Sequence, residues 1–228
     1  MLFRSGFFNR PGNPYLGPDG KDWPDNGERF AAFSFAAAEL AKGVVKGIKP
    51  KIVHLHDWQA ALAAVYIHYA KGPKTVLTVH NIAFQGQFSA RLFSSLGLPN
   101  EAYSIDGVEY YGGVSFLKGG LAYADAITTV SPTYADEICT PEFGMGLDGL
   151  LRARRSALRG IINGIDTDIW NSATDKTLPQ VYDERTLGFR VKNKRELEAK
   201  FGLEEGEGII HGVVSRLTHQ KGLDVLIE

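Results

Sequence analysis

Short apolar segments alternate with helix-length segments in the first two thirds of the chain, and this alternation constrains the fold more than any other feature. Residues 51–56 and 75–79 are apolar runs rich in β-branched residues, which is typical of buried parallel strands. Between them, residues 58–70 form an alanine-rich segment long enough for a helix that crosses over a sheet. The pattern therefore predicts βαβ units, a parallel sheet and the α/β fold class.

Further elements are expected on both sides of this unit. Asp25 or Asn26 can cap a helix in which Phe30, Phe33 and Val44 belong to one apolar stripe. The remaining expected elements are a long irregular loop over residues 81–111 with a short helix near 92–96, helices over 115–124, 150–155 and 192–201 (the last ended by Gly202), and strands over 126–130 and 158–162.

Residues 208–227 predict one more strand, loop and helix. Residues 209–214 have the composition of a buried strand, and residues 223–227 have the apolar spacing of a helix. The loop between them carries Arg216 and Lys221. Two cations beside the first N–H groups of a helix suit a diphosphate, since they can hold a doubly charged leaving group without a metal. A solvated loop with two ordinary surface cations is the alternative.

The chain is expected to contain parts of two domains. Its 228 residues exceed one typical domain and fall short of two. We expect a first domain over residues 1–170 that lacks its first strands, a linker over 171–186, and the start of a second domain over 187–228. Because a lone strand with half a helix cannot bury its own faces, we expect the chain to be a fragment of a larger enzyme.

Composition excludes several classes of protein. A net charge of −1 argues against a nucleic-acid partner held by bulk electrostatics. The single cysteine, Cys139, cannot form an internal disulfide or a thiolate zinc cluster, which fits a reducing compartment. No run approaches the ~20 apolar residues that a membrane helix needs. We therefore expect a soluble, cytoplasmic protein without nucleic-acid or membrane partners.

Polar groups follow four of the expected strands, and the carboxyl ends of strands border the ligand crevice of an open α/β sheet. Any one of them can instead be a helix cap or a loop hydrogen bond, and we assign Ser131 to a cap. We assign His80 and Asn81 to a binding site, because the aromatic and amide groups of residues 82–88 resemble a sugar subsite. The four groups are His56–Asp57, His80–Asn81, Ser131 and Asn163.

Two clusters resemble metal sites, and we favour neither. His54 and His56 share one face of a strand beside Asp57, with no third ligand of the right kind nearby. Asp166 and Asp168 form a D-x-D triplet, which can hold a divalent cation bridging a diphosphate. The triplet follows an Asn-Gly turn, so a turn or cap role is favoured. We expect neither a metal nor another cofactor.

Other enzyme classes find little support. No G-x-S-x-G is present, so the nucleophile elbow of a serine hydrolase is missing, and no complete P-loop or G-x-G-x-x-G follows a strand. A basic run is expected to be a solvated helix face, with a site for an acidic partner as the alternative. The run consists of Arg152, Arg154, Arg155 and Arg159.

Seven segments carry a resemblance to a known family, and together they cover nearly the whole chain. They are residues 10–26, 53–62, 78–88, 104–138, 140–151, 162–171 and 213–224. In this order they resemble bacterial glycogen synthases and plant starch synthases, which build α-1,4-glucan from nucleotide-activated glucose. The last segment departs at His219, where the family usually has an aromatic residue.

The resemblance implies a GT-B fold, with most of the N-terminal Rossmann-like domain and the first strand–helix unit of the C-terminal Rossmann domain in this chain. It implies retaining transfer of glucose from ADP-glucose, with UDP-glucose as second choice, to the non-reducing end of glycogen or another α-1,4-glucan. The enzyme would be cytoplasmic in a bacterium and plastidic in a plant. The alternatives are a non-catalytic glucan-binding fragment and a sister GT-B transferase that makes sucrose or trehalose phosphate.

By position, the resemblance also assigns roles to residues. His80 would lie beside the glucosyl C6 hydroxyl, while Arg216 and Lys221 would clamp the donor diphosphate. The family's amino-terminal Lys-Thr-Gly-Gly loop and carboxyl-terminal glutamate segment are absent, so we expect this chain alone to transfer little glucose. The catalytic residues are His80, Arg216 and Lys221, the donor-binding residues are Asn163 and Asn81, and the acceptor-binding residues are Tyr15, Asp57 and Trp58.

Overall fold

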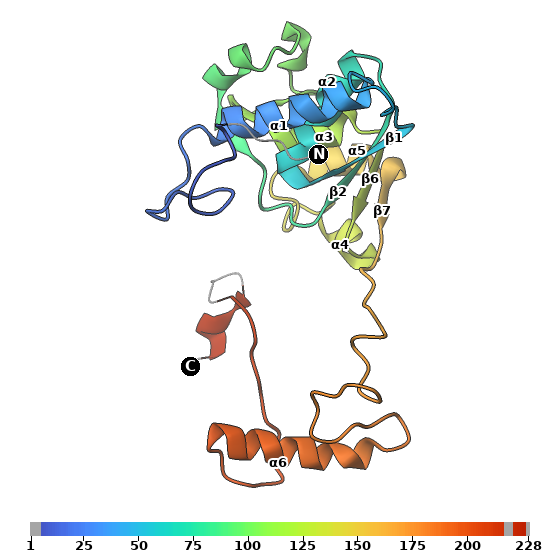
Figure 1. Cartoon of the computed structure of the whole chain (residues 1–228). Helices are drawn as coiled ribbons and strands as arrows, with labels where there is room; N and C mark the ends of the chain where they lie inside the picture. The colour runs from blue at the N-terminus through green and yellow to red at the C-terminus, as the bar shows by residue number, and fades with distance from the viewer. Residues whose placement is uncertain (1–5, 217–220, 227–228) are drawn as a thin grey trace. The chain divides into compact units, whose positions relative to one another are not determined.

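The computed structural model describes residues 6–216 and 221–226 of the chain. Contacts between residues divide it into two units, Met1–Asn163 and Gly164–Glu228, and each is described by itself (Figure 1). The expected linker over residues 171–186, and the domain limits on either side of it, stay predictions.

A four-stranded parallel sheet lies at the centre of the first unit, with the strand order β1-β2-β6-β7. All three neighbouring pairs are parallel, which confirms the predicted βαβ units and the parallel sheet. Apolar side chains of β2 and β6, such as Leu77 and Ile127, are fully buried. The strands are β1 (Ile52–His56), β2 (Lys74–Val79), β6 (Ala126–Thr129) and β7 (Leu158–Gly160).

Helix α2 (Asp57–Tyr69) packs against α1 (Asn26–Ala41) and α3 (Phe116–Tyr123) (Figure 1). Six of its residues are buried, Ala61 to Val65 and Ile67, because helices or strands cover most of its circumference. Shorter helices follow in the chain, α4 (Pro132–Glu137) and α5 (Asp148–Ala153). Every helix of the described residues is too short or too polar to cross a membrane.

Two adjacent glycines allow α3 to approach its neighbours closely. A Cβ atom on Gly119 would lie 2.7 Å from Cγ1 of Val108. A Cβ atom on Gly120 would lie 2.6 Å from Cβ of Ala61 in α2. Real Cβ atoms do not approach other carbons this closely, so the packing requires glycine at both positions.

The buried face of α1 differs from the expected stripe. Phe30 is buried, but Phe33 is 38% exposed and Val44 lies beyond the last helical residue. Small side chains face the neighbouring helix instead and let the two helices approach, so the aromatic ring at Phe33 points elsewhere. Asp25 precedes the helix, yet its carboxylate binds Arg10 at 2.7 Å rather than capping. The small buried residues are Ala31, Ser34, Ala38 and Ala41.

Two strands of a second, antiparallel sheet lie in the segment expected as an irregular loop, and the third strand follows directly after it. The strand order of this sheet is β3-β5-β4. The ammonium group of Lys118, a buried residue of α3, donates to the carbonyl oxygens of Ile105 (2.5 Å) and Gly107 (2.8 Å), and burial lowers the pKa of this lysine. The elements are β3 (Gln87–Ser89), η1 (Ala90–Ser95), η2 (Asn100–Ala102), β4 (Glu109–Tyr110) and β5 (Gly113–Ser115), where η1 and η2 are 3-10 helices.

The basic run is not simply a solvated helix face. The guanidinium of Arg154 donates to carbonyl oxygens of Leu121, Ala122 and Ala124, where α3 ends. These carbonyls have no partner within the helix, so the cation satisfies them and matches the negative end of the helix dipole. Arg152 donates to the Cys139 carbonyl at 2.8 Å. Arg152, Arg155 and Arg159 are exposed, as expected, and only Arg154 departs from the expectation, because the fold brings acceptors of another element within its reach.

The second unit contains helix α6 (Arg190–Phe201) and the 3-10 helices η4 (Leu187–Phe189) and η6 (Leu223–Leu226). Gly202 ends α6 with a φ of 63°, as predicted.

The expected strand over residues 209–214 is wrong, because these residues form no strand. Val214 is fully exposed, and a parallel strand needs a neighbour that the described part of this unit does not supply. His219 and Ile227 lie outside the described residues.

Gly120→Ala is expected to lower the free energy of unfolding by about 1–3 kcal/mol, because the new methyl group would overlap Ala61 and Leu77. Gly149→Ala is the matched control. Gly149 also lies in a helix, but a methyl group there would meet no heavy atom closer than 3.9 Å. Alanine's better helix propensity should leave this variant as stable or up to ~1 kcal/mol more stable. Urea unfolding measures both variants, and equal stabilities would contradict the close packing.

Candidate functional site

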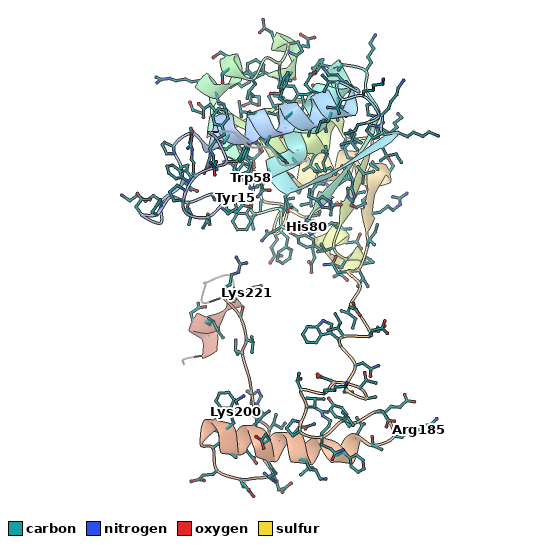
Figure 2. The ribbon with its side chains drawn as sticks, in the orientation of Figure 1. Tyr15, Trp58, His80, Arg185, Lys200 and Lys221 are labelled. Carbon is teal, nitrogen blue, oxygen red and sulfur yellow. The ribbon has the colours of Figure 1, made fainter. Side chains whose placement is uncertain are left out.

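The carboxyl ends of β1 and β2 bring two of the sequence-predicted residues together. The side-chain Oδ1 of Asp57 accepts a hydrogen bond from the main-chain N–H of His80 at 2.7 Å. The imidazoles of His56 and His80 lie side by side, with Nδ1 of His56 3.0 Å from Nε2 of His80. Figure 2 labels His80 on the first unit, together with Tyr15 and Trp58. The prediction that the polar groups after these strands lie along the same edge of the sheet is confirmed for Asp57 and His80. This edge, at the carboxyl ends of β1 and β2, is called the rim below.

Asp57 joins β1 directly to α2. Its φ is 52°, in the left-handed region that aspartate tolerates better than most residues. The sharp change of direction places the carboxylate at the first turn of α2, where a negative charge is favourable. One side chain therefore stabilises the start of a helix and the end of the neighbouring strand.

Three histidines line this rim, and each has an assigned contact. Nε2 of His54 lies 2.7 Å from the hydroxyl of Thr78, which in turn contacts Thr128 at 2.6 Å. Partial burial lowers the pKa of His56, and the neighbouring imidazoles of His54 and His80 lower it further. His56 is therefore neutral at pH 7. Among the described residues, no group of three or more His, Cys, Asp or Glu side chains is arranged to hold a metal ion.

An aromatic surface adjoins the histidines. The ring of Tyr15 stacks on Phe30 at 5.9 Å and lies 6.3 Å from the ring of Trp58. Tyr15 is 39% exposed, and its hydroxyl accepts a hydrogen bond from Gln59 at 2.9 Å. Trp58 is half-buried, and it also packs against the hydrophobic core. Trp58 directly follows Asp57 at the start of α2, so the aromatic group and the acceptor of the His80 N–H belong to neighbouring residues.

A buried arginine, which the sequence analysis did not identify, holds the loop that carries Tyr15. Arg29 is 2% exposed and donates to the carbonyl oxygens of Phe7 (2.7 Å) and Pro14 (3.2 Å) and to the Asn26 side chain (2.6 Å). Asn26 in turn donates to the Tyr15 carbonyl at 3.0 Å. Desolvation by burial lowers the pKa of Arg29. The signal available in the sequence was an arginine directly beside Phe30, a residue of the expected apolar stripe.

The loop after β2 is more internal than its sequence predicts. Asn81 accepts a hydrogen bond from the Ala83 N–H at 2.9 Å, which is a local turn. Gln85 is buried, and its amide donates to the Met145 carbonyl at 2.9 Å. The Tyr110 hydroxyl donates to the same carbonyl at 2.8 Å. Gln85 and Tyr110 thus position the loop around Met145, and neither was expected to do so.

The remaining predicted residues are distributed over both units. Asn163 is exposed at the end of the first unit, and Arg216 and Lys221 are exposed residues of the second. A joint site of these residues with His80 stays a prediction. The predicted cap at Ser131 is confirmed, since its hydroxyl accepts the Tyr134 N–H at 2.9 Å. The predicted turn at Asp166 is confirmed by its 3.0 Å hydrogen bond from the Asp168 N–H.

Comparisons with known proteins give a family and several relatives. A family model described as starch synthase catalytic domain matches residues 1–153. The glycogen synthase of Rhodopseudomonas palustris is 56% identical over 222 residues, which are 96% of this chain and 46% of that protein. The glycogen synthase of Rhizobium etli is 56% identical over 228 residues, which are 99% of this chain and 48% of that protein.

A solved structure is also similar. It is the catalytic domain of starch synthase IV from Arabidopsis thaliana bound to ADP and acarbose, with a TM-score of 0.77 and 36% sequence identity. The match covers 91% of this chain and 44% of that chain. The chain thus spans about half the length of the relatives that it matches.

Asp57→Ala is expected to destabilise the first unit by about 1–3 kcal/mol, because the His80 N–H loses its acceptor and alanine tolerates a φ of 52° poorly. Asp57→Asn keeps an oxygen at the same position and tolerates the backbone, so its cost should stay below ~1 kcal/mol. Thermal and urea unfolding compare the variants. If alanine were no worse than asparagine, the assigned hydrogen bond would contribute nothing.

Proposed function

The chain belongs to the starch synthase catalytic domain family, and on this premise we propose that it forms part of a GT-B glucosyltransferase that extends an α-1,4-glucan. The donor is ADP-glucose, with UDP-glucose as second choice, and the acceptor is the non-reducing end of glycogen or a similar glucan. The match to glycogen synthases over nearly the entire chain carries this proposal. The ADP and acarbose bound to the plant starch synthase support the choice of a nucleotide donor and a glucan acceptor. The enzyme works in the bacterial cytoplasm, or in the plastid if the source is a plant.

The donor diphosphate is held by Arg216 and Lys221 of the second unit. Charge-assisted hydrogen bonds to the phosphates stabilise the leaving group as the bond to glucose breaks. This electrostatic stabilisation is the main contribution to the rate, and it requires no metal. Asn163 and Asn81 complete the donor side of the site.

His80 lies beside the C6 hydroxyl of the transferred glucose, and its carbonyl faces the positive charge that develops on the sugar. The hydrogen bond from its N–H to Asp57 supports this role, because it fixes the orientation of the preceding peptide. The 4-hydroxyl of the glucan attacks from the face that the diphosphate leaves, so the configuration is retained.

The acceptor glucan lies along Tyr15, Asp57 and Trp58. Two contacts support this assignment, the 6.3 Å approach of the Tyr15 and Trp58 rings and the hydrogen bond of Asp57 to the His80 N–H. An exposed tyrosine with a hydroxyl near an amide offers both the apolar face and the polar partner that a sugar ring needs.

The proposed transfer can be tested by placing this chain in the R. palustris glycogen synthase in exchange for the matching 222 residues. Radiolabelled ADP-glucose and glycogen then serve as substrates. Parallel reactions replace ADP-glucose with UDP-glucose, and the formation of sucrose and of trehalose phosphate is also measured. We expect label to enter glycogen, and faster from ADP-glucose than from UDP-glucose. A folded chimera that binds glycogen without transferring label would favour the non-catalytic glucan-binding alternative.

In the same chimera, Arg216→Ala is expected to lower kcat/KM about ten- to a hundredfold, corresponding to the ~1.5–3 kcal/mol of a hydrogen bond to a charged group. Arg185→Ala is the control, since it removes an exposed arginine of the same unit that has no role in the proposed site. Turnover unaffected by Arg216→Ala would refute the diphosphate clamp.

A further inference from the structure

Two imidazoles at the carboxyl ends of β1 and β2 contact each other through ring nitrogens. Nδ1 of His56 lies 3.0 Å from Nε2 of His80, and the ring planes are inclined by 29° with centroids 5.3 Å apart. The contact is a hydrogen bond when one of the two facing nitrogens carries a proton and the other does not. The tautomer of one ring is therefore tied to the tautomer of the other.

The contact with His80 is the principal polar interaction of the His56 ring, because the groups around it are bound elsewhere. His54, on the same strand, faces it with a ring centroid distance of 4.3 Å, but Nε2 of His54 is bonded to Thr78. The carboxylate of Asp57 accepts the main-chain N–H of His80. The pKa of His56 is lowered by burial and by both neighbouring imidazoles, and Asp57 opposes this shift only in part. A neutral His56 can thus share one proton with His80 at neutral pH.

We propose that His56 is a positioning residue for His80, fixing the orientation and tautomer of its ring through the Nδ1–Nε2 hydrogen bond. This inference rests on the proposed function, in which His80 lies beside the transferred glucose. The hydrogen bond occupies Nε2 of His80 and leaves Nδ1 for the sugar hydroxyl. His80 is then fixed at two points by consecutive residues. His56, the last residue of β1, fixes its ring, and Asp57 fixes its main chain.

Proton counting gives the pH dependence of the pair. One added proton is tolerated, because a charged imidazole can still donate to a neutral one. A second added proton places N–H groups on both facing nitrogens, and the rings then repel each other. Since the pKa of His56 is lowered, the second proton binds only below the ordinary histidine pKa, and the contact is lost there.

The test uses the ¹⁵N-labelled 228-residue chain, with the imidazole nitrogens followed by NMR. His80 is assigned by the loss of its signals in His80→Gln, and the exposed His68 of α2 is the internal reference. His56→Phe keeps a ring without polar atoms, whereas His56→Asn keeps a polar atom near the position of Nδ1. We expect His80 to show a single tautomer in the wild type and in His56→Asn, and a tautomer mixture like that of His68 in His56→Phe. Melting temperatures verify that the variants are folded.

Two results would overturn the proposal. One is a His80 spectrum unchanged by His56→Phe, and the other is an equal loss in His56→Asn and His56→Phe.

The transfer assay separates this inference from the proposed function. In the chimera, His56→Phe should lower kcat on the order of ten- to a hundredfold with a smaller change in KM, and His56→Asn should recover most of the loss. An unchanged kcat in His56→Phe would overturn the positioning role. An inactive chimera whose His80 still shows a single tautomer would instead refute the proposed function, because the NMR readout does not require transfer.

Discussion

The parallel register of β1 and β2 is the constraint on which the rim depends. Partners run from Ile52 with Lys74 to His56 with Thr78, so β2 extends one residue beyond the partner of the last residue of β1. This offset puts the residue after β1, Asp57, next to the main chain of His80. A slip of one residue would turn the strand's side chains to the opposite face and separate these groups. The buried side chains Leu55 and Leu77, which fill the core beside the sheet, are paired in this register and hold it in place.

Tight helix packing supports the register from one side. Gly120 lets α3 approach both α2 and β2, because the nearest atoms to an added Cβ belong to Ala61 and Leu77. The same helix α2 begins at Asp57 and carries Trp58 in its first turn. Any movement of α2 relative to the sheet would therefore displace the aromatic surface and the acceptor of the His80 N–H together. Rigid elements, rather than loops, position this part of the rim.

Local chemistry explains which features could be predicted from the sequence. The strands of the parallel sheet, the cap at Ser131 and the end of α6 at Gly202 depend on neighbouring residues, and all were predicted. Four polar side chains bind main-chain carbonyls that only tertiary folding brings within reach. Composition and spacing could not predict these contacts. The four are Arg29, Gln85, Lys118 and Arg154. The strand expected over residues 209–214 failed for the converse reason, since its apolar residues need a paired neighbour to become a strand. Of the proposed site, the sequence identified Asp57 and His80 correctly as neighbours, but not the contact between two imidazoles.

The carbonyl of Met145 links two parts of the first unit that are distant in sequence. The left-handed backbone at this residue, with a φ of 49°, presents one oxygen to both Gln85 and Tyr110. The loop after β2 and the antiparallel sheet are thereby joined to the segment before α5 at a single atom. A flip of that one peptide would therefore deprive both donors of their acceptor at once.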